Sequence, residues 1–337
     1  RWEKEGLPEG MSGEEYFNME SYCWPPFIGS ATKLPIYPKF KEEIVSESES
    51  YKIVRTAEGI LQKEYKLGRS MPQFLEFPVK TPEDWEKLKW RLDAANEERY
   101  AGMYEVADDF NARRNVPKNR EIVPFPVDGA YAFPRNLFGE EGLAYAYYDY
   151  PELMHDIMKT WLKFYCEFTS RVCRVMDFDY IYLFEDMAFN TGPLISPKMV
   201  EEFIVPYYKE FISHLKTLGF KLFMLDCDGD ARKILPLFVD AGVNSFLPCE
   251  INAHMEPLPI QKQYGKKLSI CGGINKSVLT QGKKAIYEDI MRKVPELLRH
   301  GGYVPGIDHA VPPDVSLEDF TYFIELVRKL GREIQPD

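Results

Sequence analysis

The chain has 337 residues, 45% of them apolar by a broad count, and carries a formal net charge of −11. No run of eighteen apolar residues occurs, which argues against a membrane span. The excess of acidic residues argues against nucleic acid or another polyanion as a partner. The six cysteines include no CxxC pair, so the sequence favours a reducing cytoplasm over a disulfide framework. No signal peptide is visible, although a start at Arg1 leaves room for a lost leader.

Residues 1–119 differ in texture from the rest of the chain. An aromatic stretch without helical or strand period comprises Trp2, Tyr16, Phe17, Tyr22, Trp24, Pro25, Pro26 and Phe27. Residues 51–66 predict a hairpin around a Glu-Gly turn. Residues 82–93 and 96–115 predict helices, the first entered through Thr81-Pro82. Because no low-complexity tract or Gly/Ser linker interrupts the sequence, residues 1–337 are expected to form one domain.

From residue 120 to 337, short apolar runs alternate with amphipathic stretches. The predicted strands are 122–127, 180–184, 221–225, 244–247, 268–271 and 302–304. Helices are predicted at 151–176 and 197–217, and a last one opens with the capping-box pattern Ser316-Leu-Glu-Asp319. This alternation implies parallel strands with right-handed crossovers.

An α/β fold of this kind is either an open doubly wound sheet or a closed (β/α)8 barrel, the TIM barrel. Polar, reactive residues follow at least four of the predicted strands, which favours the barrel because a barrel gathers such residues from many strand ends. No GxGxxG or Walker pattern follows any strand, which removes the usual nucleotide-binding interpretations. The prediction is a barrel with an irregular N-terminal extension and a hairpin.

Ionisable side chains cluster at the predicted strand ends. They are Glu185, Asp186, Asp226, Asp228, Asp230, Glu250, Lys276, Asp308 and His309, beside Gly272-Gly273 and Asn275. So many carboxylates cannot all ionise in one confined mouth without raised pKa values or a cation. A divalent metal on some of Asp226, Asp228, Glu250 and His309 is the simplest remedy. The alternative is that several of them cap helices or pair with Arg232, Lys233 and Lys276.

Several motifs between about residues 120 and 335 resemble the uroporphyrinogen decarboxylase superfamily. They are Phe184-Glu-Asp-Met-Ala, Gly192-Pro-Leu-Ile-Ser-Pro197, Val205-Pro-Tyr-Tyr, Asp226-Cys-Asp-Gly-Asp230, Ala241-Gly-Val, Pro248-Cys-Glu250, Gly272-Gly-Ile and Gly301-Gly-Tyr, in the order the family has them. The resemblance implies a barrel fold and a cytoplasmic enzyme. The superfamily includes decarboxylases of tetrapyrroles and cobalamin-dependent methyltransferases that activate a thiol on zinc.

The sequence departs from both branches of that superfamily. The decarboxylases carry an Arg-Gln-Ala-Gly-Arg type of segment near the N-terminus, and this chain has none. Uroporphyrinogen bears eight carboxylates and needs cationic clamps, so an acidic mouth would repel it. The zinc methyltransferases carry His-x-Cys and a later Cys, and those positions fall here on Asp226-x-Asp228 and approximately on His309. Harder ligands weaken zinc and admit other divalent ions, so the chain resembles a divergent branch closer to the methyltransferases.

The leading hypothesis is a metal-assisted methyl transferase that acts with a corrinoid or a methylated small molecule. The predicted metal ligands are Asp226, Asp228 and His309, with zinc ahead of other divalent ions, and the predicted catalytic residues are Glu185, Asp186 and Glu250. Predicted substrate-binding residues are Arg135, Tyr182, Asn275, Lys276 and Tyr303, and the aromatic N-terminal segment is expected to wall the pocket. One alternative is a decarboxylase of a porphyrinogen or smaller carboxylate, and another is a non-catalytic barrel that binds a corrinoid or tetrapyrrole. The expected partners are a small-molecule substrate, a corrinoid protein and a second copy in a homodimer.

Overall fold

The computed structural model describes residues 1–19, 25, 34–67, 71–114 and 122–336. One continuous cluster of buried hydrophobic residues draws on the chain from Leu7 to Leu330. In the described part of the chain, no helix has both the length and the apolar character that crossing a membrane requires.

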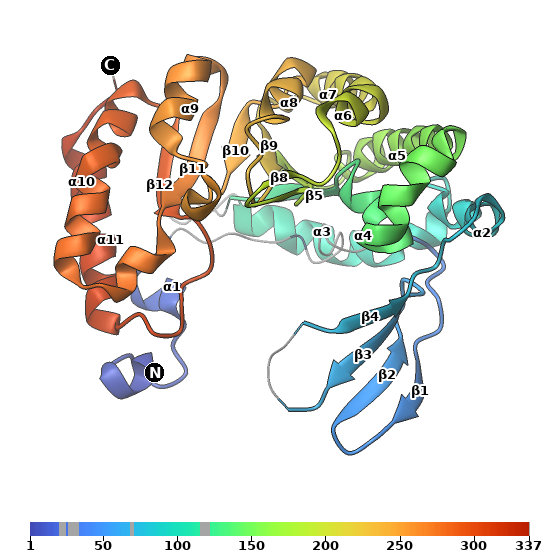
Figure 1. Cartoon of the computed structure of the whole chain (residues 1–337), viewed down its shortest axis with the longest axis horizontal. Helices are drawn as coiled ribbons and strands as arrows, with labels where there is room; N and C mark the ends of the chain where they lie inside the picture. The colour runs from blue at the N-terminus through green and yellow to red at the C-terminus, as the bar shows by residue number, and fades with distance from the viewer. Residues whose placement is uncertain (20–24, 26–33, 68–70, 115–121, 337) are drawn as a thin grey trace.

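A six-stranded parallel sheet forms the centre of the molecule (Figure 1). Its strands are β5 (Pro124–Asp128), β6 (Tyr180–Phe184), β9 (Phe223–Asp226), β10 (Ser245–Leu247), β11 (Ser269–Ile274) and β12 (Tyr303–Ile307). Each corresponds to one of the strands predicted from the sequence, and all neighbouring pairs are parallel.

The spatial order of the strands, β12-β11-β10-β9-β6-β5, follows their order in the chain without a reversal. A doubly wound sheet would reverse its order at a switch point, so that alternative does not describe this sheet. The carboxyl ends of all six strands lie at the same edge. Among the described residues no pairing joins β5 to β12, so the structure shows an α/β fold with a parallel sheet without showing closure of the predicted barrel.

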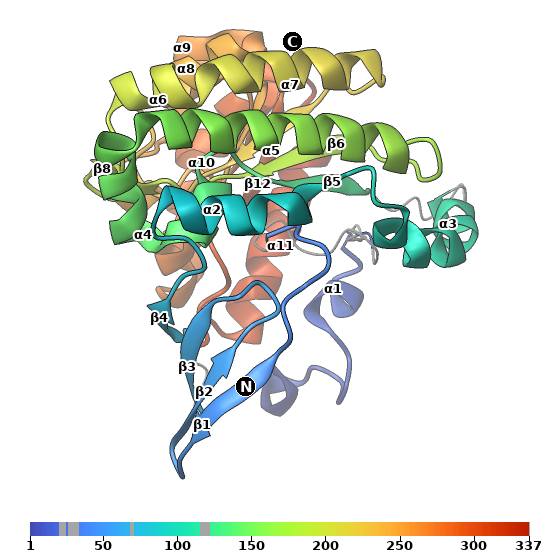
Figure 2. The ribbon, with the colours of Figure 1, turned by 90° about the vertical axis from the view of Figure 1, so that its right-hand side faces the viewer.

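Helices connect the strands and cover one face of the sheet (Figure 2). They are α4 (Ala132–Asp149), α5 (Pro151–Val172), α6 (Pro197–Phe203), α7 (Val205–Thr217), α8 (Leu235–Ala241), α9 (Pro257–Tyr264), α10 (Lys283–His300) and α11 (Leu317–Glu333). The helix predicted over 197–217 breaks at Ile204, because Pro206 has no N–H to continue the ladder. Ser316 caps α11 as predicted, accepting a hydrogen bond from the Asp319 amide at 3.0 Å.

Outside the four-stranded antiparallel sheet of residues 43–76, the described chain also contains further helices, 3-10 turns and two short strands. They are η1 (Trp2–Glu5), α1 (Gly13–Tyr16), α2 (Pro82–Leu88), η2 (Lys89–Leu92), η3 (Glu97–Tyr100), α3 (Ala101–Arg114), β7 (Ala188–Phe189), β8 (Gly192–Pro193), η4 (Ile251–Ala253), η5 (Gly265–Lys267) and η6 (Lys276–Thr280). The predicted entry to α2 is confirmed, because Thr81 and Asp84 form a reciprocal capping box.

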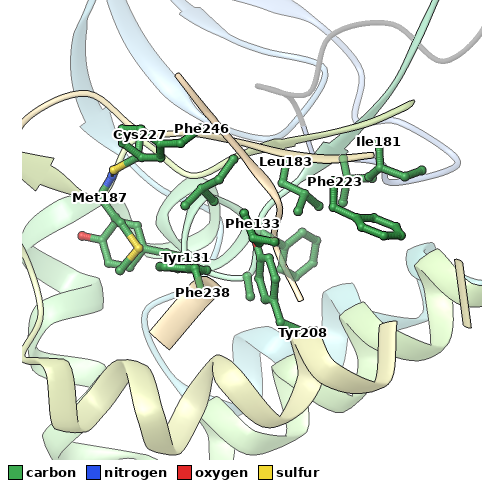
Figure 3. Close-up of a cluster of buried hydrophobic side chains, with 14 of the residues drawn as sticks. Tyr131, Phe133, Ile181, Leu183, Met187, Tyr208, Phe223, Cys227, Phe238 and Phe246 are labelled. Carbon is green, nitrogen blue, oxygen red and sulfur yellow. The ribbon is translucent and has the colours of Figure 1, made fainter. Parts of the chain in front are cut away.

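Alternate residues of the strands face the helices. Ile181 and Leu183 of β6 are fully buried, and in Figure 3 they lie in a cluster with aromatic side chains of the helices, among them Tyr208 of α7. Tyr182 and Phe184 are only half buried, because successive side chains of a strand point to opposite faces. The sheet therefore has a helix-covered face and a more open one.

A separate antiparallel sheet, β1 (Glu43–Glu47), β2 (Tyr51–Arg55), β3 (Leu61–Tyr65) and β4 (Gln73–Glu76), projects from the rest of the molecule (Figure 1). The predicted hairpin is confirmed as β2 and β3, and the sequence analysis missed the two outer strands. None of the four strands contains a buried residue.

The predicted aromatic N-terminal segment is placed only in part. The rings of Trp2 and Phe17 pack on Phe320 of α11, with centroids 5.0 and 5.2 Å away. These two residues therefore join the N-terminus to the last helix, and the expectation that the aromatic segment walls the pocket stays a prediction. Four others of the segment, Tyr22, Trp24, Pro26 and Phe27, lie outside the described residues.

Candidate active site

Acidic side chains meet at the carboxyl-terminal edge of the sheet. Asp226 is the last residue of β9, and its Oδ2 accepts a hydrogen bond from the hydroxyl of Tyr182 on the neighbouring β6. The two residues come together because Tyr182 pairs with Met224, two residues before Asp226 and on the same face. This contact joins a predicted substrate-binding residue to a predicted metal ligand.

The loops after β9, β10 and β12 bring three more predicted residues to this edge. Nδ1 of His309 lies 3.8 Å from Oδ2 of Asp228, and both side chains are roughly half exposed. Oε2 of Glu250 accepts a hydrogen bond from the amide of Gly229, at 3.0 Å. The loop that holds Asp226 and Asp228 is thus in contact with the loops that hold Glu250 and His309.

On the other side of β9, Arg135 of α4 holds the loop after β6. Its Nη1 donates to the carbonyl of Asp186 at 2.6 Å and lies 3.3 Å from the carboxylate of the same residue. Asp186 has a φ of 44°, a left-handed conformation that a non-glycine residue adopts only when its surroundings impose it. Arg135 is therefore engaged by the protein, pairing also with Glu140 at 3.6 Å, and its contact with a substrate stays a prediction.

Burial and crowding raise the pKa values of the central carboxyls. The pKa of Asp226 is raised from 3.8 to about 7; burial is the largest cause, Asp228 and Asp186 act in the same direction, and the bond from Tyr182 opposes the shift. Burial also raises the pKa of Asp228, against the opposing effect of His309. Asp226 therefore exchanges its proton near neutral pH, which is the property expected of a general acid or base.

Glu185, a predicted catalytic residue, lies on the helix-covered face of the sheet. Its carboxyl is fully buried, accepts hydrogen bonds from the Tyr131 and Ala132 amides at 2.8 and 3.0 Å, and accepts another from the hydroxyl of Tyr208. A Cβ at Gly129 would lie 2.3 Å from the same carboxyl. Glu185 therefore holds the turn into α4 and is closed off from a substrate in this arrangement, which is the helix-capping role that the sequence left as the alternative.

Tyr303 also lies away from the strand-end group. It is the first residue of β12, and its buried hydroxyl donates to the carbonyl of Gly272 at 2.9 Å. Active-site residues of such sheets follow the strands rather than begin them. The Tyr303 hydroxyl is therefore engaged by the backbone of β11 in this arrangement, and its contact with a substrate stays a prediction.

The two remaining predicted binding residues follow β11. Asn275 begins η6, accepting a hydrogen bond from the amide of Ser277 at 2.9 Å. The neighbouring Lys276 influences Asp228, whose pKa its charge lowers. Lys276 is therefore near enough for its charge to act on Asp228, and the substrate-binding roles of Lys276 and Asn275 stay predictions.

Asp128 is a candidate that the sequence analysis missed. It ends β5, is almost fully buried, and both of its carboxyl oxygens lie within 3.4 Å of the Asn136 amide nitrogen. Burial raises its pKa well above the ordinary value, with Asn136 and Arg135 opposing the shift. The sequence pattern could have identified Asp128, since it follows a predicted apolar strand as the other acidic residues do.

The residues predicted to bind a metal do not fit one as they are placed. Within the described ranges, no three His, Cys, Asp or Glu side chains form a group that could hold a metal ion. In this arrangement one oxygen of Asp226 accepts the bond from Tyr182, and among the described residues Asp226 does not join Asp228 and His309 as a third ligand. The described side chains supply acids and bases for proton transfer, and the predicted metal site stays a prediction.

A parallel α/β sheet with ionisable residues after its strands is the layout of an enzyme of the barrel type. The family model for uroporphyrinogen decarboxylase (URO-D) matches residues 64–330. Because the match spans most of the chain, the protein belongs to this family, and the resemblance seen in the sequence motifs is confirmed.

Two known proteins show how far the similarity extends. A uroporphyrinogen decarboxylase from Danio rerio is 22% identical over an alignment of 283 residues that covers 78% of this chain and 70% of that protein. A solved structure of a methyltransferase from Methanosarcina mazei superposes with a TM-score of 0.61, at 13% identity, over 95% of this chain and 82% of its own. At this identity the superposition establishes a shared fold, and members of the superfamily with either activity are enzymes.

Proposed function

We propose that this protein transfers a methyl group from a methylated small molecule to a corrinoid carried by a partner protein, with Asp226 as the proton donor. The observation that carries the proposal is the group made by Asp226 with Tyr182 and Asp228 with His309, at one edge of the sheet. We also infer that the six strands belong to the closed (β/α)8 barrel predicted from the sequence, because their order has no reversal.

The proton balance of methyl transfer matches this group. The bond between the methyl carbon and a donor oxygen or nitrogen breaks, the carbon bonds to the acceptor, and the leaving atom needs a proton. Asp226 holds such a proton near neutral pH because its carboxyl is buried beside other carboxylates. Tyr182 orients the carboxyl, and His309 with Asp228 offers a route by which solvent returns the proton.

The same edge offers groups that would bind the donor molecule. Lys276 and Arg135 supply positive charge, Asn275 supplies an amide, and Glu250 and Asp186 supply carboxylates. Because acidic residues outnumber basic ones once Asp226 and Asp228 are counted with this set, the proposal favours a neutral or cationic donor over a polyanion. A bound corrinoid would supply the nucleophile that receives the methyl group.

Decarboxylation is the second candidate, because the similar protein from Danio rerio is a uroporphyrinogen decarboxylase. Replacing a carboxyl group by hydrogen also needs a proton, which Asp226 would give to carbon. A porphyrinogen substrate is disfavoured because its carboxylates would be repelled by the acidic residues around Asp226, among them Asp228 and Asp186. We expect no measurable conversion of uroporphyrinogen, and steady formation of coproporphyrinogen would decide for the decarboxylase.

The deciding assay incubates the protein with reduced cobalamin and a panel of methyl ethers and methylamines, without oxygen, and follows demethylated product by mass spectrometry. One donor class should be demethylated, and Asp226→Asn should lower its kcat by about 100-fold, the usual contribution of a general acid. Asp230→Asn is the matched control, because the Asp230 carboxylate pairs with the guanidinium of Arg232 in its own loop. Cobalamin binding without turnover of any donor or porphyrinogen would favour the non-catalytic alternative.

A further inference from the structure

Asp308 connects three separate loops at the carboxyl-terminal edge of the sheet. It follows β12 directly, and its side chain is completely buried. Oδ2 accepts a hydrogen bond from the amide of Ile251 and Oδ1 accepts one from the amide of Lys276, each at 2.9 Å. One carboxylate thereby bonds to the backbone of the loop after β10 and to that of the loop after β11.

The residues held by these bonds are neighbours of the site. Ile251 follows Glu250, Lys276 follows Asn275, and His309 follows Asp308 itself. The Asp308 amide donates to the carbonyl of Ile274 at 2.8 Å, which fixes the β12 end of the arrangement as well. A shift of the loop after β10 or of the loop after β11 would therefore break its buried hydrogen bond to Asp308.

We propose that Asp308 is a positioning residue that makes the loops after β10, β11 and β12 one rigid unit, presenting Glu250, Lys276 and His309 together. The other part of the site, Asp226 with Tyr182, lies on β9 and β6 and does not depend on this unit. Contact between the two parts runs through Gly229 and Glu250, and through Asp228 and His309. Asp308 thus sets where the second part of the site meets the first.

A carboxylate suits this task because each oxygen can accept a bond from a different backbone amide. Asparagine has one acceptor oxygen, and its NH2 group is a donor that would face an amide donor. Asp308→Asn should therefore leave at least one of the two amides without its partner, and Asp308→Ala should leave both without one. Because an unpaired buried amide is unfavourable, the freed loop should open to water.

Amide hydrogen exchange at single-residue resolution tests this arrangement without any substrate. In the native protein the Ile251 and Lys276 amides should exchange slowly. In Asp308→Ala both should exchange at least about tenfold faster, and in Asp308→Asn at least one should. The Gly273 amide, which donates to the carbonyl of Pro248 at 2.9 Å, is the internal control and should keep its rate. Fast exchange of both amides in the native protein, or unchanged rates in a folded variant, would overturn the inference.

The kinetic readout of this inference rests on the proposed function. Asp308→Asn should reduce kcat/KM by about 10- to 100-fold through misplaced groups, mainly by raising KM, whereas Asp230→Asn should change neither constant more than about twofold. Lost amide protection with unchanged KM would show that Asp308 joins the loops without positioning the site. Absence of methyl transfer in the native protein would remove the proposed function, and the exchange rates alone would then decide the role of Asp308.

Discussion

Removing the hydroxyl of Tyr182 should raise the pKa of Asp226 and not lower it. In the native protein, burial raises that pKa to about 7, while the bond from Tyr182 stabilises the ionised carboxyl and limits the rise. A hydrogen bond to a charged group contributes about 1.5–3 kcal/mol, and each pKa unit corresponds to about 1.4 kcal/mol. Tyr182→Phe should therefore move the pKa of Asp226 upward by about one to two units.

The titration can be followed by carboxyl-carbon NMR, with Asp226→Asn to assign the signal. Tyr303→Phe is the matched control, since it removes a hydroxyl that donates to the carbonyl of Gly272 and should leave the pKa of Asp226 unchanged. If Asp226 titrates at lower pH in the Tyr182→Phe protein than in the native protein, the effect assigned to the Tyr182 hydroxyl is wrong. If native Asp226 titrates near pH 4, burial is not the dominant cause.

The same shift predicts how stability depends on pH. Between about pH 4 and 7 folded Asp226 keeps a proton that the unfolded chain has lost, because its folded pKa lies above its ordinary value of 3.8. The contribution of Asp226 to the free energy of unfolding should therefore be largest below this window. It should fall as pH rises, by up to about 4 kcal/mol for a shift of about three units. Urea unfolding of the native protein against Asp226→Asn isolates this contribution, and a difference that does not vary with pH would contradict it.

Three further predictions concern stability. Glu185→Ala should lower the free energy of unfolding by about 3 kcal/mol or more, because it leaves buried donors of Tyr131 and Ala132 unpaired; unchanged urea unfolding with lost activity would instead support the catalytic role predicted for Glu185. His309→Ala should change unfolding by less than about 1 kcal/mol, since its pair with Asp228 is half exposed, whereas a larger loss accompanied by released metal in elemental analysis would restore the predicted metal site. Gly139→Ala should destabilise the protein by about 2 kcal/mol in thermal melts, because Gly139 has a φ of 73° and a Cβ there would lie 2.3 Å from Phe77. Gly142→Ala in the same helix is the control and should be neutral or stabilising. Equal effects of the two substitutions would refute the packing argument.

Local sequence pattern determined the strands and the residues that follow them. The apolar runs at 122–127 and 180–184 became β5 and β6, because a strand buried among helices must be continuously apolar. The strand-end position of Asp226, Asp228, Glu250 and His309 followed from the same pattern. The outer strands β1 and β4 were missed because nearly all of their residues are exposed, whereas β2 and β3 are mostly half buried, and a strand without a buried face shows no clear alternation.

The tertiary structure alone decided what each strand-end residue faces. Glu185 and Asp186 are adjacent in sequence, yet one is buried against Tyr208 while the other bonds to Arg135, because neighbouring side chains leave a strand in opposite directions. Asp308 was as conspicuous in sequence as His309, but its two amide partners come from loops that precede it by 57 and 32 residues. Those contacts depend on strand order and register in space, and a single sequence specifies chemical identity at each position without revealing which distant backbone groups will meet it.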